Sequence, residues 1–170
     1  AMIDLNGIAA LRGIRDAEDG VEIGAATTLR EIIRDERLRR DYGLLVSAAG
    51  VVASPQIRNV GTLGGNLVQD ARCWYYRRGL SCYRAGGNTC YADTPQGMNR
   101  EHCVFGASRC VAVSPSDTAT AIAALDATMV VQSVGRQRLV AAEDFFVGPA
   151  THITRMTSLE PGEILTAVRI

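Results

Sequence analysis

The sequence predicts an α+β fold, in which an antiparallel sheet is flanked by helices and carries a long cysteine-rich insertion. Short alternating or β-branched runs near both ends of the chain indicate strands, and capped apolar segments between them indicate helices. The regular strand-helix-strand alternation of a doubly wound parallel sheet is absent. The five cysteines all lie between Cys73 and Cys110. This clustering makes that window the most informative part of the composition.

The N-terminal elements follow from local patterns. Residues 21–25 alternate between apolar and polar side chains, as expected for a strand. Thr28 and Glu31 have the spacing of a capping box, which predicts a helix from Leu29 to about Asp35. The next helix ends before Pro55, because proline supplies no amide and restricts the residue before it. Its apolar face consists of Leu44, Leu45, Ala48, Ala49 and Val52.

The central part of the chain is rich in glycine and then in cysteine. Gly61, Gly64 and Gly65 predict a tight backbone between residues 58 and 66. Residues 72 to 110 show no sustained hydrophobic period and are predicted to form the insertion. A loop of this length within a domain is uncommon and usually functional. We therefore expect a bound group to hold it together.

Regular structure resumes after the insertion. Residues 114–117, Ser-Pro-Ser-Asp, resemble a helix cap, and an alanine-rich helix is predicted from Thr118 to about Asp126. Residues 128–132 and 138–140 flank a turn and predict a β-hairpin. Residues 164–170 predict a final strand. Together these elements account for an antiparallel sheet.

Composition narrows the functional class. The chain has 170 residues, of which 47% are hydrophobic and 21% charged, so it should fold as one soluble domain. Basic and acidic residues are equal at 18 each, which argues against nucleic acid or an anionic membrane as a partner. No signal-peptide pattern is visible, so the expected location is cytoplasmic, with periplasmic export alongside a partner subunit as the alternative. The abrupt ends and Ala1 before Met2 suggest an excised fragment.

One run carries a specific resemblance. Residues 54–67, Ser-Pro-Gln-Ile-Arg-Asn-Val-Gly-Thr-Leu-Gly-Gly-Asn-Leu, resemble the FAD-binding motif of the medium subunit of the xanthine dehydrogenase and carbon monoxide dehydrogenase family. Residues 114–117, 121–127 and 161–165 look like further landmarks of that family in the expected order. The resemblance implies that residues 1–170 are the second subdomain of the FAD-binding domain. An N-terminal FAD subdomain and a C-terminal domain of the family have no counterpart in this stretch, so half of the FAD site could be missing.

The resemblance also implies the flavin-binding residues. Thr62, Leu63, Gly64, Gly65 and Asn66 would line the flavin and its phosphates, and the motif can supply free backbone amides and small side chains. Asp117 would accept a hydrogen bond from a cofactor hydroxyl, and Val52 and Leu165 would pack against the flavin. The alternatives are a glycine-rich turn without a ligand and an Asp117 that only caps a helix. No catalytic residues are predicted.

The insertion itself resembles a loop that distinguishes one subfamily. It is similar to the loop of 4-hydroxybenzoyl-CoA reductase and of periplasmic aldehyde oxidoreductases, which implies a 4Fe-4S cluster on Cys73, Cys82, Cys90 and Cys110. Thiolates are the ligands that iron-sulfur clusters prefer. Cys103 would be the spare cysteine. A zinc site that includes His102 beside Cys103, a set of disulfides, and unrelated core cysteines remain as alternatives.

The whole enzyme implied by the resemblance is a molybdenum hydroxylase or reductase. A large subunit would hold the molybdenum cofactor, a small subunit would hold 2Fe-2S centres, and this chain would pass electrons through FAD. The alternative is a cysteine-rich metal-binding or docking module that does not bind flavin. Substrate chemistry would take place in another subunit.

Overall fold

The computed structural model describes residues 3–170, which fall into two compact units. The first, which we call the sheet unit, comprises the chain up to Val68 together with Ser116–Phe145 and Leu159–Ile170. The second, the cysteine unit, comprises Gln69–Pro115 and Phe146–Ser158. The predicted insertion, residues 72–110, thus lies inside the cysteine unit. The contribution of residues 146–158 to that unit was not predicted from the sequence.

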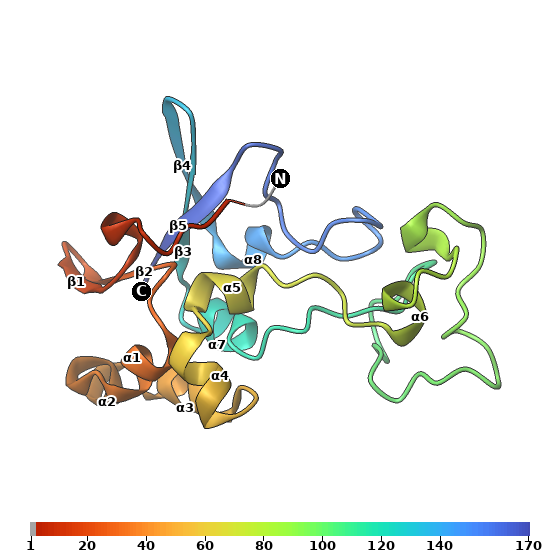
Figure 1. Ribbon diagram of the computed structural model, residues 1–170, viewed down its shortest axis with the longest axis horizontal. Coiled ribbons are helices and arrows are strands. Elements are labelled where there is room, and N and C mark those ends of the chain that lie inside the picture. Colours follow the sequence, from red (N-terminus) through yellow and green to blue (C-terminus); the bar gives the residue numbers. More distant parts are fainter. Residues whose placement is uncertain (1–2) are drawn as a thin grey trace. The chain divides into compact units, whose positions relative to one another are not determined.

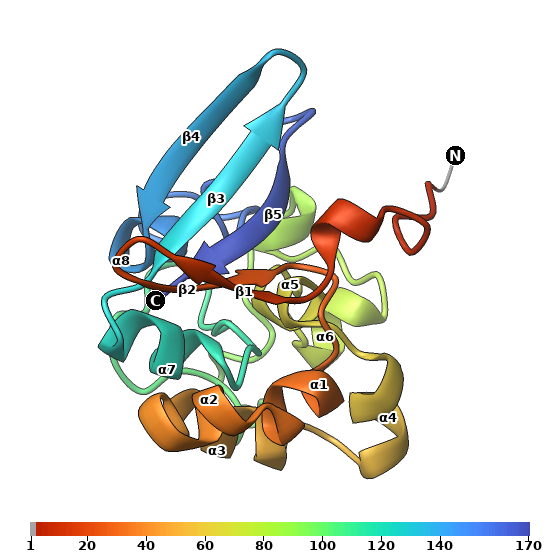
Figure 2. The ribbon, with the colours of Figure 1, turned by 90° about the vertical axis from the view of Figure 1, so that its left-hand side faces the viewer.

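The sheet has five strands in the order β1-β2-β5-β3-β4, and each neighbouring pair is antiparallel (Figure 2). The prediction of an α+β fold with an antiparallel sheet is therefore confirmed. The strands are β1 (Ile14–Ala17), β2 (Gly20–Gly24), β3 (Thr128–Ser133), β4 (Arg136–Ala141) and β5 (Ile164–Arg169). The last strand of the sequence lies at the centre of the sheet, so residues from both ends of the chain share one core.

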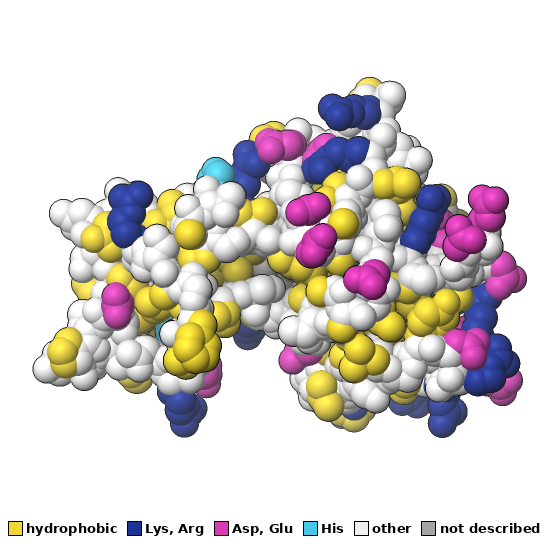
Figure 3. Space-filling view, turned by 180° about the vertical axis from the view of Figure 1, so that it is seen from behind, with side chains coloured by type: hydrophobic (Ala, Val, Ile, Leu, Met, Phe, Trp, Pro, Cys, Tyr) yellow, Lys and Arg dark blue, Asp and Glu magenta, His cyan; other side chains and the backbone are white. Residues whose placement is uncertain are grey.

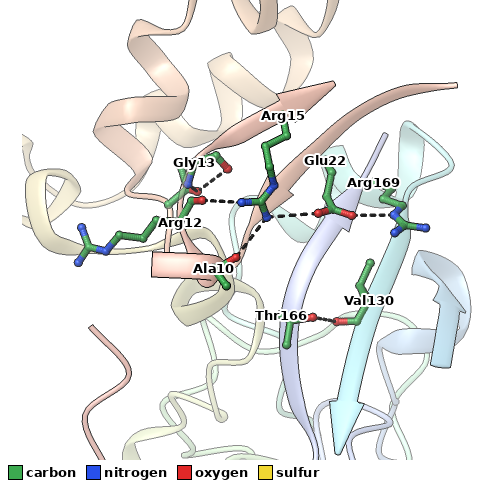
Figure 4. Close-up of polar contacts among 9 residues, drawn as sticks. Ala10, Arg12, Gly13, Arg15, Glu22, Val130, Thr166 and Arg169 are labelled. Carbon is green, nitrogen blue, oxygen red and sulfur yellow. Dashed lines mark hydrogen bonds and ion pairs between the residues drawn. The ribbon is translucent and has the colours of Figure 1, made fainter. Parts of the chain in front are cut away.

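Charged residues pair across the N-terminal edge of this sheet. Glu22 lies opposite Arg15 of β1 on one side and Arg169 of β5 on the other. Its carboxylate accepts hydrogen bonds from Arg169 Nε at 2.8 Å and from Arg15 Nη2 at 3.2 Å (Figure 4). Opposite charges at directly paired positions favour this register over a shifted one. The bond from Arg169, the stronger influence, and that from Arg15 lower the pKa of Glu22 despite its partial burial.

The predicted helices are present with small changes in their bounds. The α1 helix (Leu29–Arg34) begins with the predicted capping box. The Thr28 side chain accepts a hydrogen bond from the Glu31 backbone amide, and the Glu31 carboxylate accepts one from the Thr28 backbone amide. It buries Leu29 and Ile32. The α7 helix (Ala119–Ala124) is shorter than predicted, because Asp126 adopts a positive φ of 49°.

The second predicted helix is α3 (Gly43–Val51), and it buries Leu45 and Ala49. Leu44 is 51% exposed, so its assignment to the buried face was wrong. The stretch from 58 to 66 contains parts of two short helices and not only a tight turn. The remaining helices of the sheet unit are η1 (Ala9–Leu11), α2 (Glu36–Asp41), α4 (Pro55–Val60), α5 (Leu63–Leu67) and α8 (Ala142–Phe145).

The core of the sheet unit lies between the sheet and these helices. Buried side chains from β2, β3 and β5 and from α1, α3 and α7 contribute to this core, while α8 contacts β3 and β4 and α5 contacts β5. Phe145 of α8 closes this layer and is fully buried. The largest buried side chains include Ile23, Leu29, Ile32, Leu45, Ile122, Met129 and Val168. This continuous apolar layer gives the sheet unit a hydrophobic core of its own.

The cysteine unit contains little regular structure, as predicted for this window (Figure 1). Its helical segments within the described residues are α6 (Trp74–Arg77) and η2 (Tyr83–Ala85). A small apolar cluster joins Ala71, Cys110 and Ala112, with Ile153 and Met156 packed against it. A short antiparallel contact between Phe146 and Thr157 closes the segment 146–158. The order of this unit therefore depends on particular side chains.

The surface agrees with the balanced composition. Acidic and basic side chains are interspersed on the face drawn in Figure 3. Within residues 3–170, no helix is both long enough and apolar enough to cross a membrane. The expectation that the chain does not bind nucleic acid or a membrane stays a prediction.

Candidate functional site

A glycine-rich cavity lies in the sheet unit, between α5 and the beginning of β5. Its volume is about 350 Å³, which falls in the range of small-molecule sites. Four of the predicted flavin-binding residues line it: Thr62, Gly64, Gly65 and Leu165. Further lining comes from apolar residues, among them Leu5, Leu11, Val68, Leu159 and Ile164. The structure therefore brings half of the predicted set into one place.

The two central glycines have different roles. A Cβ atom on Gly64 would lie 2.8 Å from Ala25 Cβ and 2.9 Å from the Ala25 carbonyl oxygen. Gly64 therefore allows α5 to approach the chain that follows β2. A Cβ atom on Gly65 would meet only Thr62 Oγ1, at 3.0 Å, and Gly65 is exposed. Packing requires a glycine at position 64, whereas at position 65 the small residue leaves the cavity open.

The backbone amides of this motif are not free, which differs from the sequence-based expectation. Leu63 N–H donates to the Thr27 carbonyl at 2.9 Å, and Gly64 N–H donates to Ala25 at 2.8 Å. Gly65 N–H donates to the Thr62 hydroxyl at 3.1 Å. Asn66 N–H donates to the Thr62 carbonyl at 3.0 Å. The motif thus offers a ligand an open surface of small residues, and its amides are already used to hold α5.

Asn66 is buried and binds the protein itself. Its side-chain oxygen accepts hydrogen bonds from Ser116 Oγ at 2.8 Å and from Thr118 Oγ1 at 2.6 Å. The Thr118 amide donates to the same oxygen at 3.2 Å. Ser116 Oγ in turn accepts a hydrogen bond from the Ala119 amide, at the first residue of α7, at 3.1 Å. Asn66 therefore joins α5 to the start of α7, and it does not line the cavity.

The other predicted flavin residues also lie outside the cavity lining. Leu63 is fully buried in the core, and Val52 is buried at the end of α3. Asp117 is exposed at the start of α7. Their proposed contacts with flavin are untested by this geometry. Of the predicted set, Thr62, Gly64, Gly65 and Leu165 are the residues that line this cavity.

Glu163 adds a fixed charge to the cavity that the sequence did not single out. Its carboxylate receives two hydrogen bonds from Arg138 of β4, from Nε at 2.8 Å and from Nη2 at 2.6 Å. The Glu160 amide donates a third bond at 2.9 Å. The Arg138 bonds, followed by the amide bond, lower the pKa of Glu163 to about 2. The Glu163 carboxylate therefore stays charged at neutral pH. The only sequence signal for this residue was its position in the run 161–165, one of the family landmarks.

A second cavity lies wholly within the cysteine unit. Cys73, Cys82, Cys90 and Cys110 all line it, whereas Cys103 does not. These are the four cysteines selected from the sequence, and the excluded fifth one is the predicted spare. All five are free thiols in this structure, so no disulfide set is present among them. Burial raises the pKa of the Cys110 thiol, and the nearby Cys90 and Cys82 raise it further.

Two polar side chains of this cavity have buried nitrogen atoms without a partner. Arg84 Nε and both ring nitrogens of His102 make no hydrogen bond within the described part of the chain. Both residues line the cavity with the cysteines. Buried polar groups are almost always satisfied, so these atoms are available to contact a water or another group in the cavity. His102 was considered as a zinc ligand from the sequence, whereas Arg84 was missed because it is one of several arginines in the window.

The four thiols that line this cavity are soft donors, of the kind that hold an iron-sulfur cluster or a zinc ion. Across residues 3–170, no three His, Cys, Asp or Glu side chains are grouped so that they could hold one ion. The free volume at the centre of the cavity is about 20 Å³. That is room for about one water molecule, so the side chains around the cavity would have to move outward to take up a group of several atoms.

A known protein family and several known relatives match nearly the whole length of the chain. The family model described as "FAD binding domain in molybdopterin dehydrogenase" matches residues 1–170. The chain is 37% identical to the aldehyde oxidoreductase FAD-binding subunit PaoB of Escherichia coli K12, over 99% of this chain and 54% of the relative. It is 28% identical to the carbon monoxide dehydrogenase medium chain of Hydrogenophaga pseudoflava, over 99% of this chain and 42% of the relative.

Solved structures of two related enzymes match the fold of the chain. A crystal structure of Cu,Mo-CO dehydrogenase in its cyanide-inactivated form matches 98% of this chain and 42% of its own, with a TM-score of 0.66 and 26% identity. Quinoline 2-oxidoreductase from Pseudomonas putida 86 matches the same shares, with a TM-score of 0.63 and 26% identity. The chain thus spans about half the length of the relatives it matches. It belongs to the family of FAD-binding domains of molybdopterin dehydrogenases.

Proposed function

We propose that this chain is part of the FAD-binding, electron-transferring subunit of a molybdenum-containing oxidoreductase. The observation that carries the proposal is the convergence of Thr62, Gly64, Gly65 and Leu165 on one cavity, in a chain of the FAD-binding family. The cavity is large enough for part of FAD. The family's N-terminal subdomain would complete the site, as the resemblance implies.

The residues of the cavity have distinct tasks in this proposal. Gly64 and Gly65 keep one wall low, so a flat aromatic ring or a phosphate chain can approach the backbone. Leu165 and its apolar neighbours exclude water from the ring. Glu163 is held by Arg138 and keeps a fixed negative charge at the entrance to β5. Flavin and an iron-sulfur cluster supply the electron exchange itself, while the protein binds and orients them.

Gly65 offers a direct test of the flavin site. In the full subunit, Gly65→Val should release FAD, because the new side chain would fill the cavity with little effect on the fold. Leu139→Val, an exposed position on β4 away from this cavity, is the matched control and should keep its flavin. Flavin absorbance after gel filtration measures the outcome. An FAD content in Gly65→Val equal to that of the control would contradict the site.

We further propose that Cys73, Cys82, Cys90 and Cys110 hold a 4Fe-4S cluster that relays electrons to or from FAD. The support is the shared cavity, which includes these four cysteines and leaves out Cys103. The unpartnered nitrogens of Arg84 and His102 add to it. The subunit purified without oxygen should contain about four iron and four sulfide per chain. One zinc per chain with no sulfide would show that the cavity serves a different metal.

The partners follow from the same proposal. The complete subunit would assemble with a large subunit that holds the molybdenum cofactor and a small subunit with 2Fe-2S centres. Relatives named as a medium chain or as an FAD-binding subunit support such an assembly. The alternative of a docking module without flavin is not favoured, because the family match covers the entire chain. Copurification from the native operon would test the assembly.

A further inference from the structure

Arg84 is a buried cation in the cysteine cavity. Its side chain is 2% exposed. The guanidinium donates to the carbonyls of Ile153 at 2.8 Å and Thr154 at 3.0 Å, and it pairs with Asp70. It also lies over the Tyr76 ring, 5.2 Å from the centroid. These contacts use the two terminal nitrogens and fix the plane of the guanidinium.

The charge of Arg84 is paired with one carboxylate, which is itself partly exposed. Asp70 is the carboxylate bonded to it, and the Asp70 side chain is 56% exposed. That carboxylate also accepts hydrogen bonds from the Ala71 amide at 2.7 Å and from Tyr76 Oη at 3.1 Å. A buried charge is costly unless it is paired and hydrogen-bonded. The Arg84 guanidinium of this pair is buried and lines the cysteine cavity, and its Nε has no partner among the described residues.

The four cysteines can supply an anionic group. Four thiolates outnumber the positive charges of an iron-sulfur core, so the ligated cluster is anionic in both of its oxidation states. One-electron reduction adds one further negative charge and neither forms nor breaks a bond. A nearby cation therefore stabilises the reduced form more than the oxidised form. Hydrogen bonds to the sulfur atoms and burial are established influences on cluster potential.

We propose that Arg84 is a redox-tuning residue, which raises the reduction potential of the group bound by Cys73, Cys82, Cys90 and Cys110. This inference rests on the proposed cluster. The buried guanidinium contributes a positive charge at low local dielectric, and its Nε–H makes no hydrogen bond to the described residues, the cysteine sulfurs included. Arg84 is a positioning and electrostatic residue here, because it does not ligate the metal.

Arg109 provides a matched control. It lines the same cavity and its guanidinium lies 5.8 Å from the centroid of the Tyr83 ring. Unlike Arg84, it is exposed, so water and salt screen its charge. Removal of either arginine deletes one positive charge from the same unit. The two substitutions therefore separate the effect of a buried cation from that of net charge.

The test is a potentiometric titration of the anaerobic full-length subunit, with the reduced cluster followed by electron paramagnetic resonance. Arg84→Gln should lower the equilibrium constant for one-electron reduction by at least about tenfold, which corresponds to about 59 mV. Arg109→Gln should shift the reduction potential by less than half of that number of millivolts. An unchanged potential in Arg84→Gln, or equal shifts in the two variants, would overturn the inference.

Arg84→Lys covers the case in which Arg84→Gln does not assemble a cluster. Retention of the cluster by lysine at a potential near that of the wild type would support the need for a cation. Loss of the cluster in both variants would overturn the inference. The shape of the guanidinium, and not its positive charge, would then be what the site requires. A wild-type subunit without iron and sulfide would instead contradict the proposed function, before Arg84 is examined.

Discussion

The sheet unit and the cysteine unit are ordered by different means. In the sheet unit, five strands share a continuous ladder, and a layer of buried aliphatic side chains packs against the helices. In the cysteine unit, the apolar cluster consists of little more than Ala71, Cys110 and Ala112 with a few neighbours. Particular polar and aromatic contacts add to it, such as the network of Arg84 and the stacked rings of Tyr75 and Tyr91.

This difference predicts that the sheet unit tolerates the loss of a single side chain better than the cysteine unit does. A hydrophobic core distributes its stabilisation over many contacts, whereas the cysteine unit depends on a few groups that meet around one cavity. Ordering each backbone residue costs about 1 to 2 kcal/mol, and a small apolar cluster offsets little of that cost. Metal-sulfur bonds would supply the missing stabilisation if the proposed cluster is present.

The largest expected effect follows from this contrast and concerns the cysteines. Serine in place of Cys73, Cys82, Cys90 or Cys110 should remove most of the iron and sulfide. Amide hydrogen exchange should then rise across residues 69–115 and stay unchanged in the strands of the sheet unit. Cys103→Ser, the control, should keep the cluster. Equal protection in all five variants would show that the cysteine unit is ordered without metal.

Within the sheet unit, the two glycines of α5 should differ in their effect on stability. Gly64→Ala should lower the free energy of unfolding by about 1 to 3 kcal/mol, because the new methyl group would overlap Ala25. Gly65→Ala should stay within about 1 kcal/mol of the wild type, since its contact with Thr62 offsets the gain in helix propensity. Urea unfolding followed by circular dichroism measures both. A larger loss in Gly65→Ala would reverse the roles given to these glycines.

A smaller effect is expected at the first helix. Thr28→Ala should cost about 1 kcal/mol, because it removes the side chain that accepts the Glu31 amide bond at 3.1 Å. Thr120→Ala, at an exposed position inside α7, should change stability by no more than about 0.5 kcal/mol. The same urea experiment compares the two. Similar values for both would mean that the capping box does not stabilise α1.

The smallest effect is the pH dependence of the Glu163 pair. The folded pKa of Glu163 is about 2, below its ordinary value of 4.5, so its stabilisation is present above pH 4.5 and is lost as the pH falls toward 2. Glu163→Gln should therefore melt below the wild type at pH 6, and the difference should shrink between pH 4.5 and pH 2. Glu18→Gln, an exposed carboxylate, is the control. A constant difference over that range would contradict the linkage.

Local sequence was sufficient for much of the fold. The Thr28 and Glu31 spacing placed α1, and the residues around Gly135 placed the hairpin of β3 and β4. Signals of this kind act between residues a few positions apart, so they can be read without the rest of the chain. The concentration of cysteines also identified the window that became a separate unit.

Tertiary structure decided which residues meet. The amides of residues 63–66 are used because Thr27 and Ala25 come close to α5, and Asn66 binds Ser116 and Thr118 from 50 residues further along the chain. Arg84 became distinct from the other arginines only when residues 153 and 154 supplied its carbonyl partners. Contacts between distant segments depend on how the packed core brings the chain together, and no local spacing encodes them. The sequence by itself determined the elements and the ligand candidates, and packing determined their surroundings.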